Sequence, residues 1–574
     1  MRDATLLMET GPMEKSRTNA GKDTLLRAGK RLLKVGLDSR LVRDVVSAPR
    51  GAPDVLAEIV RHGLSVKNVH AIHAAQHPER LAMVDEHRQV TYAQANDEIN
   101  RVGNALRNSF GVKRGTPVVL MMENRVEYLT CWFSLFRIGA SGVHASYRMT
   151  AEELGYQVDH SGARILFVSP TSLEAARELD RTRDDLDLTI ILVGDETPPD
   201  GVLGYAHVID QASSEFATPS GRRVSKDESQ NIVYTSGTTG QPKGTVRNFT
   251  KYGLLEFTRL LDRLPLQAGD RHLVVAPVYH SGGQVFTLLN SALAATLVLR
   301  PHFDAQDTLE HLSSEQINTV FMVPTMIRRV LDLPDDVHRQ NPTPTLRGLI
   351  SGAAPFPRVL RERAIERFGA STVHDFYGAT ELGWVTLING EEMRERPGSV
   401  GRPLAGQEVR ILDDDMNEVP RGEVGKIWVR NQHAVSGYLH DRKASDEIRA
   451  GDWVTVEDLG YIDEDDYVYL AGRARDMVIS GGVNIYPVEV ENVLAQHPSV
   501  DDVAVIGVPD EEWGETLVAV VVPANDTLDT DVLEAHAREH LTGYKVPRRW
   551  VTTDAIPRNP TGKILKNELE RRYS

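Results

Sequence analysis

The clearest chemistry in the sequence lies in one polar run that follows an apolar segment, Ile232 to Tyr234. The run reads Thr235-Ser236-Gly237-Thr238-Thr239-Gly240-Gln241-Pro242-Lys243-Gly244. Its glycines let backbone N–H groups approach an anion, while the hydroxyls and the lysine add donors and a positive charge. A Walker A loop needs G-x-x-x-x-G-K-[ST], whereas here Gly237, Gly240 and Lys243 recur every third residue. The composition therefore predicts a polyphosphate-binding loop of another kind.

This loop resembles the signature loop of the adenylate-forming superfamily, which contains acyl-CoA synthetases, peptide-synthetase adenylation domains and luciferases. Such enzymes activate a carboxylate with ATP, release pyrophosphate, and pass the acyl group from AMP to an acceptor. The resemblance extends over about residues 70–574, with the motifs in the order of the superfamily. It implies ATP-binding roles for Thr235, Ser236, Gly237, Thr238, Thr239, Gly240 and Lys243.

The small residues at Ser351 to Pro355 match the stretch that lines the adenine pocket in this superfamily. Small side chains permit the close approach of a flat ring. The resemblance assigns this role to Gly352, Ala353 and Ala354.

The segment His374 to Glu381 resembles the Y-G-x-T-E motif of the superfamily. The match implies that Tyr377 stacks on adenine beside Gly378, and that Thr380 donates to the α-phosphate. It implies that Glu381 holds Mg²⁺, a hard cation that prefers carboxylate and phosphate oxygens.

Further along the chain, Asp458 resembles the aspartate that accepts hydrogen bonds from both ribose hydroxyls, and Arg473 would contact the same ribose. The residues Val456-Glu457 stand where Thr-Gly is usual, which puts the local turn in doubt.

The segment after Gly472 resembles the hinge, with Arg475 at the pivot of a domain rotation between the two half-reactions. The glycines that would border the pantetheine channel of CoA are Gly481 and Gly482.

The C-terminal run Pro560 to Lys566 resembles the P-x-G-K motif that carries the catalytic lysine. Lys563 would bridge the substrate carboxylate and the α-phosphate, where charge develops during the reaction. We expect no catalytic role for the neighbouring Lys566.

The segment Val278 to Gln284 resembles the motif at the acyl pocket, with His280 facing the carboxylate and counted among the catalytic residues. Amino-acid-activating relatives usually carry an aspartate there, so His280 argues against an amino acid. The small residues Gly282 and Gly283, with apolar residues after them, favour an open apolar tunnel. We therefore expect a medium- to long-chain fatty-acyl-CoA synthetase that uses ATP, Mg²⁺ and CoA.

Three alternatives stay open. A fatty-acyl-AMP ligase would hand the acyl group to a carrier protein, an aryl- or steroid-side-chain-CoA ligase would activate a different acid, and a degenerate member would only bind nucleotide.

The elements around these motifs indicate an α/β fold. Short runs rich in Val, Ile and Leu alternate with helical segments, which predicts largely parallel sheets. The expected strands are 118–122, 164–168, 189–193, 272–276, 296–299, 319–323, 424–430, 467–473, 503–509 and 517–523. We expect a basic leader (1–67), a large adenylation domain of layered mixed sheets with a small β-barrel-like part (68–473), and a small mobile α+β domain (474–574).

Composition limits the remaining possibilities. The chain has 574 residues, with 81 acidic against 65 basic ones and a net charge of -16, so a global cationic field for nucleic acid is absent. The single cysteine, Cys131, excludes an internal disulfide and a cysteine-rich metal site. No apolar run has the length of a membrane span, and we expect a cytoplasmic protein. A basic amphipathic helix is expected near residues 25–34, and such a helix could contact a membrane surface. A homodimer is a separate open alternative.

Overall fold

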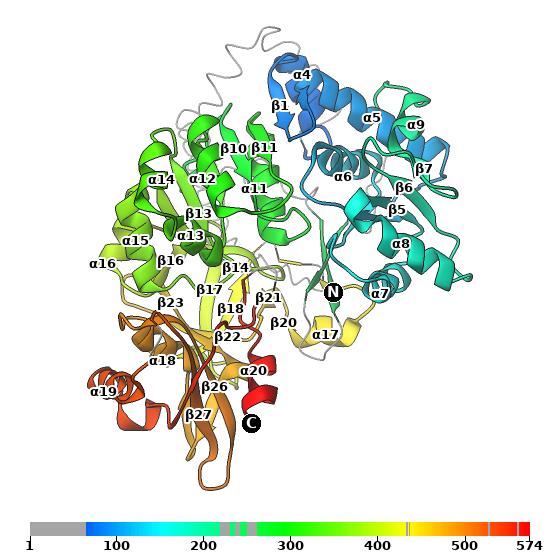
Figure 1. Cartoon of the computed structure of the whole chain (residues 1–574). Coiled ribbons are helices and arrows are strands. Elements are labelled where there is room, and N and C mark those ends of the chain that lie inside the picture. The colour runs from blue at the N-terminus through cyan, green and yellow to red at the C-terminus, as the bar shows by residue number, and fades with distance from the viewer. Residues whose placement is uncertain are drawn as a thin grey trace, which may run out of the picture.

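The computed structural model places two lobes one above the other (Figure 1). It describes residues 65–217, 230–235, 242–248, 261–431, 434–435, 437–525, 528–559 and 562–574. The predicted basic leader helix and loop residues 236–241 lie outside the described residues.

An eight-stranded sheet forms one half of the large lobe. Its strand order is β19-β9-β8-β4-β3-β5-β6-β7, and the neighbours from β8 to β7 are parallel. The strands are β3 (Pro117–Met121), β4 (Ser141–His144), β5 (Ile165–Val168), β6 (Thr189–Leu192), β7 (Leu203–Gly204), β8 (Asn231–Thr235), β9 (Lys243–Arg247) and β19 (Gly437–Tyr438). The helices of this half are α5 (Tyr92–Asn108), α6 (Val126–Ile138), α7 (Ala151–Ser161), α8 (Pro170–Thr182) and α9 (Tyr205–Asp210).

A second sheet of 15 strands forms the other half of the large lobe, parallel from β1 to β14 and antiparallel beyond. Its first strands are β1 (Leu81–Val84), β2 (Gln89–Thr91), β10 (Arg271–Val274), β11 (Thr296–Leu299), β12 (Thr319–Phe321), β13 (Gly348–Ser351), β14 (Val373–Ala379) and β15 (Gly383–Asn389). The helices are α4 (Val69–Gln76), α11 (Ser281–Ala292), α12 (Ala305–Ser314), α13 (Pro324–Leu331), α14 (Asp335–Gln340), α15 (Arg358–Phe368) and α16 (Gly390–Glu395). Helix α17 (Arg442–Glu447) lies between β19 of the first sheet and β20 of the second.

The expected β-barrel-like part is not a closed barrel. Its strands continue the second sheet as an open path, β16-β23-β22-β18-β21-β20, with β17 paired to β18. They are β16 (Ser399–Pro403), β17 (Glu408–Leu412), β18 (Gly425–Arg430), β20 (Arg449–Ala450), β21 (Trp453–Val454), β22 (Asp458–Ile462) and β23 (Val468–Arg473). Through this path Asp458 of β22, paired with Arg473 of β23, reaches Tyr377 of β14.

The small lobe begins after β23 and has its own core. A 3₁₀ turn (Ala474–Asp476) leads into a five-stranded sheet with the path β25-β24-β27-β26, to which β28 adds alongside β27. The elements are β24 (Val478–Ser480), β25 (Val483–Ile485), β26 (Val500–Asp510), β27 (Gly514–Pro523), β28 (Arg549–Thr552), α18 (Pro487–Leu494), α19 (Thr530–His540), a 3₁₀ turn (Gly543–Lys545) and α20 (Lys566–Tyr573). Buried Val505, Ala519 and Leu533 lie in one core cluster between sheet and helices.

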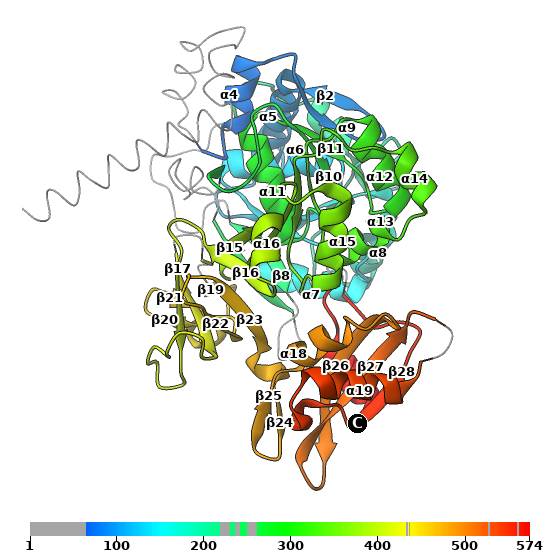
Figure 2. The same ribbon diagram turned by 90° about the vertical axis from the view of Figure 1, so that its left-hand side faces the viewer.

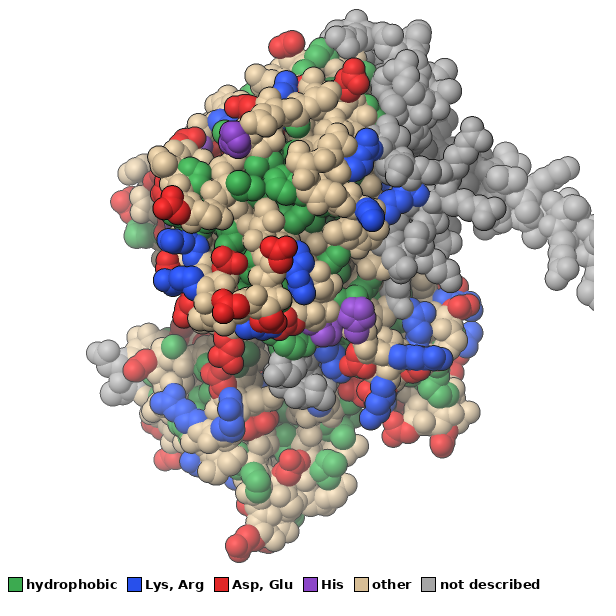
Figure 3. Space-filling view, turned by 90° about the vertical axis from the view of Figure 1, so that its right-hand side faces the viewer, with side chains coloured by type: hydrophobic (Ala, Val, Ile, Leu, Met, Phe, Trp, Pro, Cys, Tyr) green, Lys and Arg blue, Asp and Glu red, His purple; other side chains and the backbone are tan. Residues whose placement is uncertain are grey.

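All residues of helix α6 are buried, including the free Cys131. No helix among the described residues is long and apolar enough to cross a membrane. On the face seen in Figure 3, basic and acidic side chains are interspersed over both lobes.

Candidate active site

The base of the predicted phosphate loop lies beside a tyrosine of another strand. Thr235 and Lys243 are opposite each other in the antiparallel β8–β9 pair. The Lys243 ammonium lies 5.3 Å from the ring centroid of Tyr438 on β19, whose strand pairs with β9. The Tyr438 hydroxyl donates a hydrogen bond of 3.1 Å to Glu381 Oε1. Burial first, and then the Glu381 carboxylate, raises the pKa of Tyr438.

The turn between β14 and β15 carries Thr380 and Glu381 and is held from three sides. The guanidinium of Arg247 on β9 donates to the Thr380 carbonyl, and the Ser281 hydroxyl donates to Thr380 Oγ1 at 3.1 Å. The Val435 N–H donates to the Glu381 carbonyl at 2.9 Å. The phosphate-loop strand and the N-terminus of α11 are therefore tied to this turn.

A group of two buried residues and one partly exposed arginine lies next to that turn. The Tyr377 hydroxyl donates a 2.8 Å hydrogen bond to Asp458 Oδ2, and Arg473 Nε lies 3.3 Å from Asp458 Oδ1. Asp458 and Arg473 are also direct partners in the β22–β23 ladder. Burial, followed by the Asp458 carboxylate, raises the pKa of Tyr377 well above its usual value. The side chains assigned to adenine and ribose thus lie in one hydrogen-bonded group.

The small residues predicted for the adenine pocket form a turn after β13. A Cβ at Gly352 would lie 2.3 Å from the Phe376 ring, so only glycine fits there. Ala353 has a φ of 68°, a left-handed conformation that costs energy for a residue with a side chain. A Cβ at Gly378 would lie 2.2 Å from the Gly383 carbonyl oxygen. Close packing, against an aromatic ring at Gly352 and against backbone at Gly378, therefore accounts for these glycines.

The unusual Val456-Glu457 pair keeps the turn that was in doubt. Glu457 has a φ of 63°, so it adopts the left-handed conformation that glycine ordinarily supplies. Its N–H donates to Thr455 Oγ1 at 3.1 Å, and its carbonyl accepts from the Ala474 N–H at 2.9 Å. These bonds hold the strained residue and leave Asp458 in place.

The small lobe places Lys563 against this group. Burial and the neighbouring Arg473 lower the pKa of Lys563, while Glu381 and Asp458 act in the opposite direction. A Cβ at Gly562 would lie 2.8 Å from Thr325 Oγ1 of α13, so the lysine turn packs directly on the large lobe. The two carboxylates of the large lobe and the lysine of the small lobe therefore share one electrostatic site.

Lys566, in contrast, makes its contacts within the small lobe. Its ammonium donates to the Val505 carbonyl at 2.9 Å and pairs with Glu491 at 2.8 Å. That Lys566 has no catalytic role stays a prediction.

His280 precedes α11 and lies within the electrostatic reach of Lys563. Burial first, and then Lys563, lowers the pKa of His280 to about 4, so the imidazole is neutral at physiological pH. Its Nε2 is buried and has no hydrogen-bond partner among the residues that the structure describes. A neutral imidazole here adds no charge that would compete with the lysine for an anion.

The predicted acyl pocket is more tightly packed near His280 than an open tunnel requires. A Cβ at Gly282 would lie 2.8 Å from the Phe321 ring, and one at Gly283 would lie 2.4 Å from the Pro277 carbonyl oxygen. Phe321 stacks on Phe286 with ring centroids 4.9 Å apart, and Phe376 packs against both. The three phenylalanine rings therefore form a packed aromatic cluster between the start of α11 and Tyr377.

The hinge and channel residues lie on the small lobe, and the structure does not bring the two glycines to the lysine. Arg475 pairs with Asp476 at 3.4 Å in the 3₁₀ turn after β23. Gly481 and Gly482 form the β24–β25 turn, with φ of 58° and 79°, and Figure 2 shows this hairpin at the end of the small lobe away from α11. Their role in a CoA channel stays a prediction.

Sequence reasoning missed Tyr438, Arg247, Ser281 and Thr325, which hold the site together. Their positions depend on strand pairing and lobe packing between segments far apart in the chain. Of these four residues, Ser281 alone lies within a motif identified in the sequence, since it follows His280 in the segment Val278 to Gln284.

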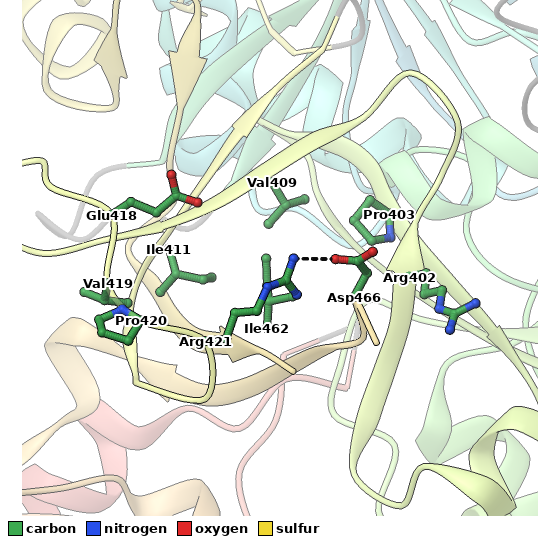
Figure 4. Close-up of a pocket in the computed structure, with 10 residues that line it drawn as sticks. All are labelled: Arg402, Pro403, Val409, Ile411, Glu418, Val419, Pro420, Arg421, Ile462 and Asp466. Atoms are coloured by element: carbon green, nitrogen blue, oxygen red, sulfur yellow. Dashed lines mark hydrogen bonds and ion pairs between the residues drawn. The ribbon is translucent and has the colours of Figure 1, made fainter. Parts of the chain in front are cut away.

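A separate pocket of about 350 Å³ lies in the β17–β18 region (Figure 4). Its wall includes Arg421 and Asp466, which pair at 2.7 Å, over apolar Val409 and Ile462. None of the predicted site residues lines it, so it is not the candidate active site.

Comparisons with known proteins match most of the chain to one family of enzymes. The model of the family described as AMP-binding enzyme matches residues 71–439, and that of the AMP-binding enzyme C-terminal domain matches residues 489–563. A feruloyl-CoA synthase of Amycolatopsis is 34% identical, over 87% of this chain and 97% of its own. A long-chain-fatty-acid–CoA ligase of Mycobacterium tuberculosis is 30% identical, over 85% and 93%. The crystal structure of an anthranilate CoA ligase with anthranoyl-AMP superposes with a TM-score of 0.80 at 27% identity, over 89% and 97%.

Proposed function

Because the chain belongs to the AMP-binding enzymes of the adenylate-forming superfamily, we propose that it is an acid–CoA ligase. In the first half-reaction, the acid carboxylate attacks the α-phosphorus of ATP, which forms acyl-AMP and releases pyrophosphate. In the second, the CoA thiol attacks the acyl carbon, and AMP leaves. No covalent bond to the enzyme is needed.

One observation carries this proposal. Lys563 of the small lobe lies in the field of Glu381, Asp458 and Arg473 of the large lobe. A carboxylate and a triphosphate repel each other, so their approach needs a fixed cation between them. Lys563 is the group that supplies it, and Lys243 adds positive charge at the base of the phosphate loop.

Asp458 and Tyr377 orient the nucleoside in this proposal. The Asp458 carboxylate, fixed by Tyr377 and Arg473, accepts hydrogen bonds from the ribose, while the Tyr377 ring covers the adenine. Orientation of this kind lowers the entropy cost of the reaction.

Glu381 is the residue that would hold Mg²⁺. Mg²⁺ in such sites binds one or two carboxylates together with substrate phosphates, and the described residues contain no cluster of three or more acidic, histidine or cysteine ligands. A single carboxylate beside the phosphate loop fits that pattern. The ion would neutralise phosphate charge when bound.

For the acid, the packing beside His280 favours a flat aryl acid over the fatty acid expected from the sequence. The Phe321 ring fills the space next to Gly282, and three aromatic rings form the packed cluster. Stacked aromatic side chains suit a planar acyl group. The similarity to a feruloyl-CoA synthase supports the same choice.

A medium- to long-chain fatty acid is the second candidate. It is favoured by the similarity to a mycobacterial long-chain ligase and by the apolar residues Leu288, Leu289 and Ala292 of α11.

A product assay separates these possibilities. The protein is incubated with ATP, Mg²⁺, CoA and one acid at a time, chosen from benzoic, cinnamic, octanoic and palmitic acid, and pyrophosphate and thioester are both measured. We expect the highest kcat/KM with an aryl acid. A clear preference for palmitic acid would overturn the aryl choice but keep the ligase. Acyl-AMP that accumulates without thioester would point to a carrier-protein acceptor, and no pyrophosphate with any acid would overturn the proposed function.

A further inference from the structure

A second contact between the lobes uses none of the predicted nucleotide residues. On helix α13 of the large lobe, the Arg328 guanidinium donates a 2.6 Å hydrogen bond to the Asp501 carbonyl, at the start of β26 in the small lobe. The same guanidinium lies 3.8 Å from the Asp501 carboxylate. Thr325, which packs on Gly562 of the lysine turn, stands three residues before Arg328 and therefore on the same face of the helix. Helix α13 thus meets the small lobe at two points.

Asp501 can accept this bond because it is an extra residue in its strand. In the β26–β27 ladder, Val500 is opposite Pro523 and Asp502 is opposite Val522, with a shift of register between the two pairs. A bulge of this kind bends the strand and leaves the extra residue unpaired in the ladder. The Asp501 carbonyl is thereby available to a donor from the other lobe.

The residue after the bulge continues the contact to the lysine turn. Both Asp502 carboxylate oxygens accept from the Arg558 guanidinium, at 2.9 and 2.8 Å, and this guanidinium also donates to the Gly562 carbonyl at 2.7 Å. The Asp502 and Arg558 side chains are only 19% and 24% exposed. The Asn559 side chain accepts from the Lys563 N–H at 3.0 Å, and the Asn559 N–H donates to the Lys563 carbonyl at 2.9 Å. The backbone of Lys563 is therefore tied to the strand that α13 holds.

The Arg328 bond favours one arrangement of the lobes more than it favours the fold of either lobe. A partly exposed ion pair adds little to folding stability, and the carbonyl that Arg328 contacts belongs to the other lobe, so the bond exists only in this arrangement. The adjacent Arg329 differs, because its guanidinium covers the Phe303 ring of its own lobe at 5.2 Å. A contact made in one of two arrangements shifts the equilibrium towards that arrangement.

We propose that Arg328 is a positioning residue for acyl-AMP formation, because its bond to the small lobe holds Lys563 at the active site. This inference rests on the proposed function. Arg328 acts through the Asp501 bulge and the Asp502–Arg558 pair rather than on a substrate. The rotation predicted about Arg475 would break the bond, so thioester formation does not need it.

The test compares Arg328→Gln with Arg329→Gln, which removes the same charge from the next position of α13. Pyrophosphate release is measured with ATP, Mg²⁺ and whichever of the four acids the wild type prefers. We expect Arg328→Gln to lower kcat about tenfold, as for the loss of a hydrogen bond from a charged group, with little change in the KM for ATP. Thioester formation from CoA and the supplied acyl-AMP should keep the wild-type rate, and Arg329→Gln should match wild type in both half-reactions.

Tryptic cleavage between the lobes gives a readout without turnover. A small lobe that is held less firmly should expose the hinge more often, so cleavage after Arg473 or Arg475, identified by fragment mass, should be several times faster in Arg328→Gln than in Arg329→Gln. Equal cleavage rates in the two variants, or equal losses in the two half-reactions of Arg328→Gln, would overturn the inference while the ligase activity stands. A wild-type protein that releases no pyrophosphate with any acid would instead overturn the proposed function.

Discussion

The Tyr377 hydroxyl donates a 2.8 Å hydrogen bond to the Asp458 carboxylate, and so joins two strands that are 81 positions apart in the chain. Tyr377 belongs to β14 and Asp458 to β22, which come together only because the second sheet continues past β16 into β23. The same carboxylate meets Arg473 on its other oxygen. This arrangement orients Asp458 before any nucleotide binds.

Replacing Tyr377 with Phe keeps the ring and removes the hydrogen bond. Since a hydrogen bond to a charged group contributes about 1.5–3 kcal/mol, we expect the KM for ATP to rise at least about tenfold, with a smaller change in kcat. Tyr461→Phe on β22, whose ring stacks on Tyr469, is the matched control and should keep the wild-type KM. Pyrophosphate-release kinetics at varied ATP measure both. Equal KM values in the two variants would show that the bond does not position the ribose contact.

Replacing Lys563 should affect the two half-reactions differently. Lys563→Ala removes the cation beside Glu381 and Asp458, so pyrophosphate release should fall by at least about 100-fold. Thioester formation from supplied acyl-AMP should be much less affected, because the charge repulsion between acid and ATP is absent there. Comparable losses in both half-reactions would contradict the assigned role.

Lys566→Ala should instead lower stability and leave catalysis near the wild-type value. Its ammonium pairs with Glu491, and the two side chains are only 11% and 14% exposed, so its removal leaves a nearly buried carboxylate without its partner. A loss of about 3 kcal/mol in the free energy of unfolding is expected from denaturant titration. An unchanged unfolding midpoint would show that the pair contributes little.

The strands could be predicted from the sequence, because apolar runs are a local signal. The glycine and hydroxyl pattern at Thr235 to Gly244 predicts a phosphate loop by a local signal of its own, and that role stays a prediction. The Glu457 turn was doubtful from the sequence, since a left-handed φ is rare for a glutamate, and only its two backbone hydrogen bonds explain why it persists.

The acid pocket could not be predicted in the same way. Small residues in a sequence predict open space for a substrate. The space beside Gly282 is filled by Phe321, which comes 39 positions later in the chain. Tyr438 was missed for the same reason, because its contact with Glu381 depends on the pairing of β19 with β9. Which residue fills a gap is decided by tertiary packing.

Phe321→Ala should therefore change which acid is preferred. Removing the ring opens space next to Gly282 and between Phe286 and Phe376, so kcat/KM for a longer or bulkier acid should rise relative to cinnamic acid by about tenfold, which corresponds to 1.4 kcal/mol. Phe303→Ala, which removes a ring that Arg329 covers elsewhere in the lobe, is the control. A preference ratio that stays constant in Phe321→Ala would place the acyl group elsewhere.

Buried histidines should make the protein less stable in mild acid. Burial lowers the pKa of His144 and His272 to about 3, and burial together with Lys563 lowers the pKa of His280 to about 4. Below the ordinary value of about 6.5, the unfolded chain binds protons that the folded chain does not, so stability falls as the pH falls from about 6.5 towards 4. Asp375 acts against this trend, because burial raises its pKa to about 6 and the folded state keeps its proton there.

Three histidines outweigh the one aspartate, and we expect the free energy of unfolding to be at least about 3 kcal/mol lower at pH 5 than at pH 7. Denaturant titrations across this range measure the slope. His272→Asn should make the slope shallower by close to one proton. A slope that His272→Asn does not change would mean that this histidine is not held neutral in the folded protein.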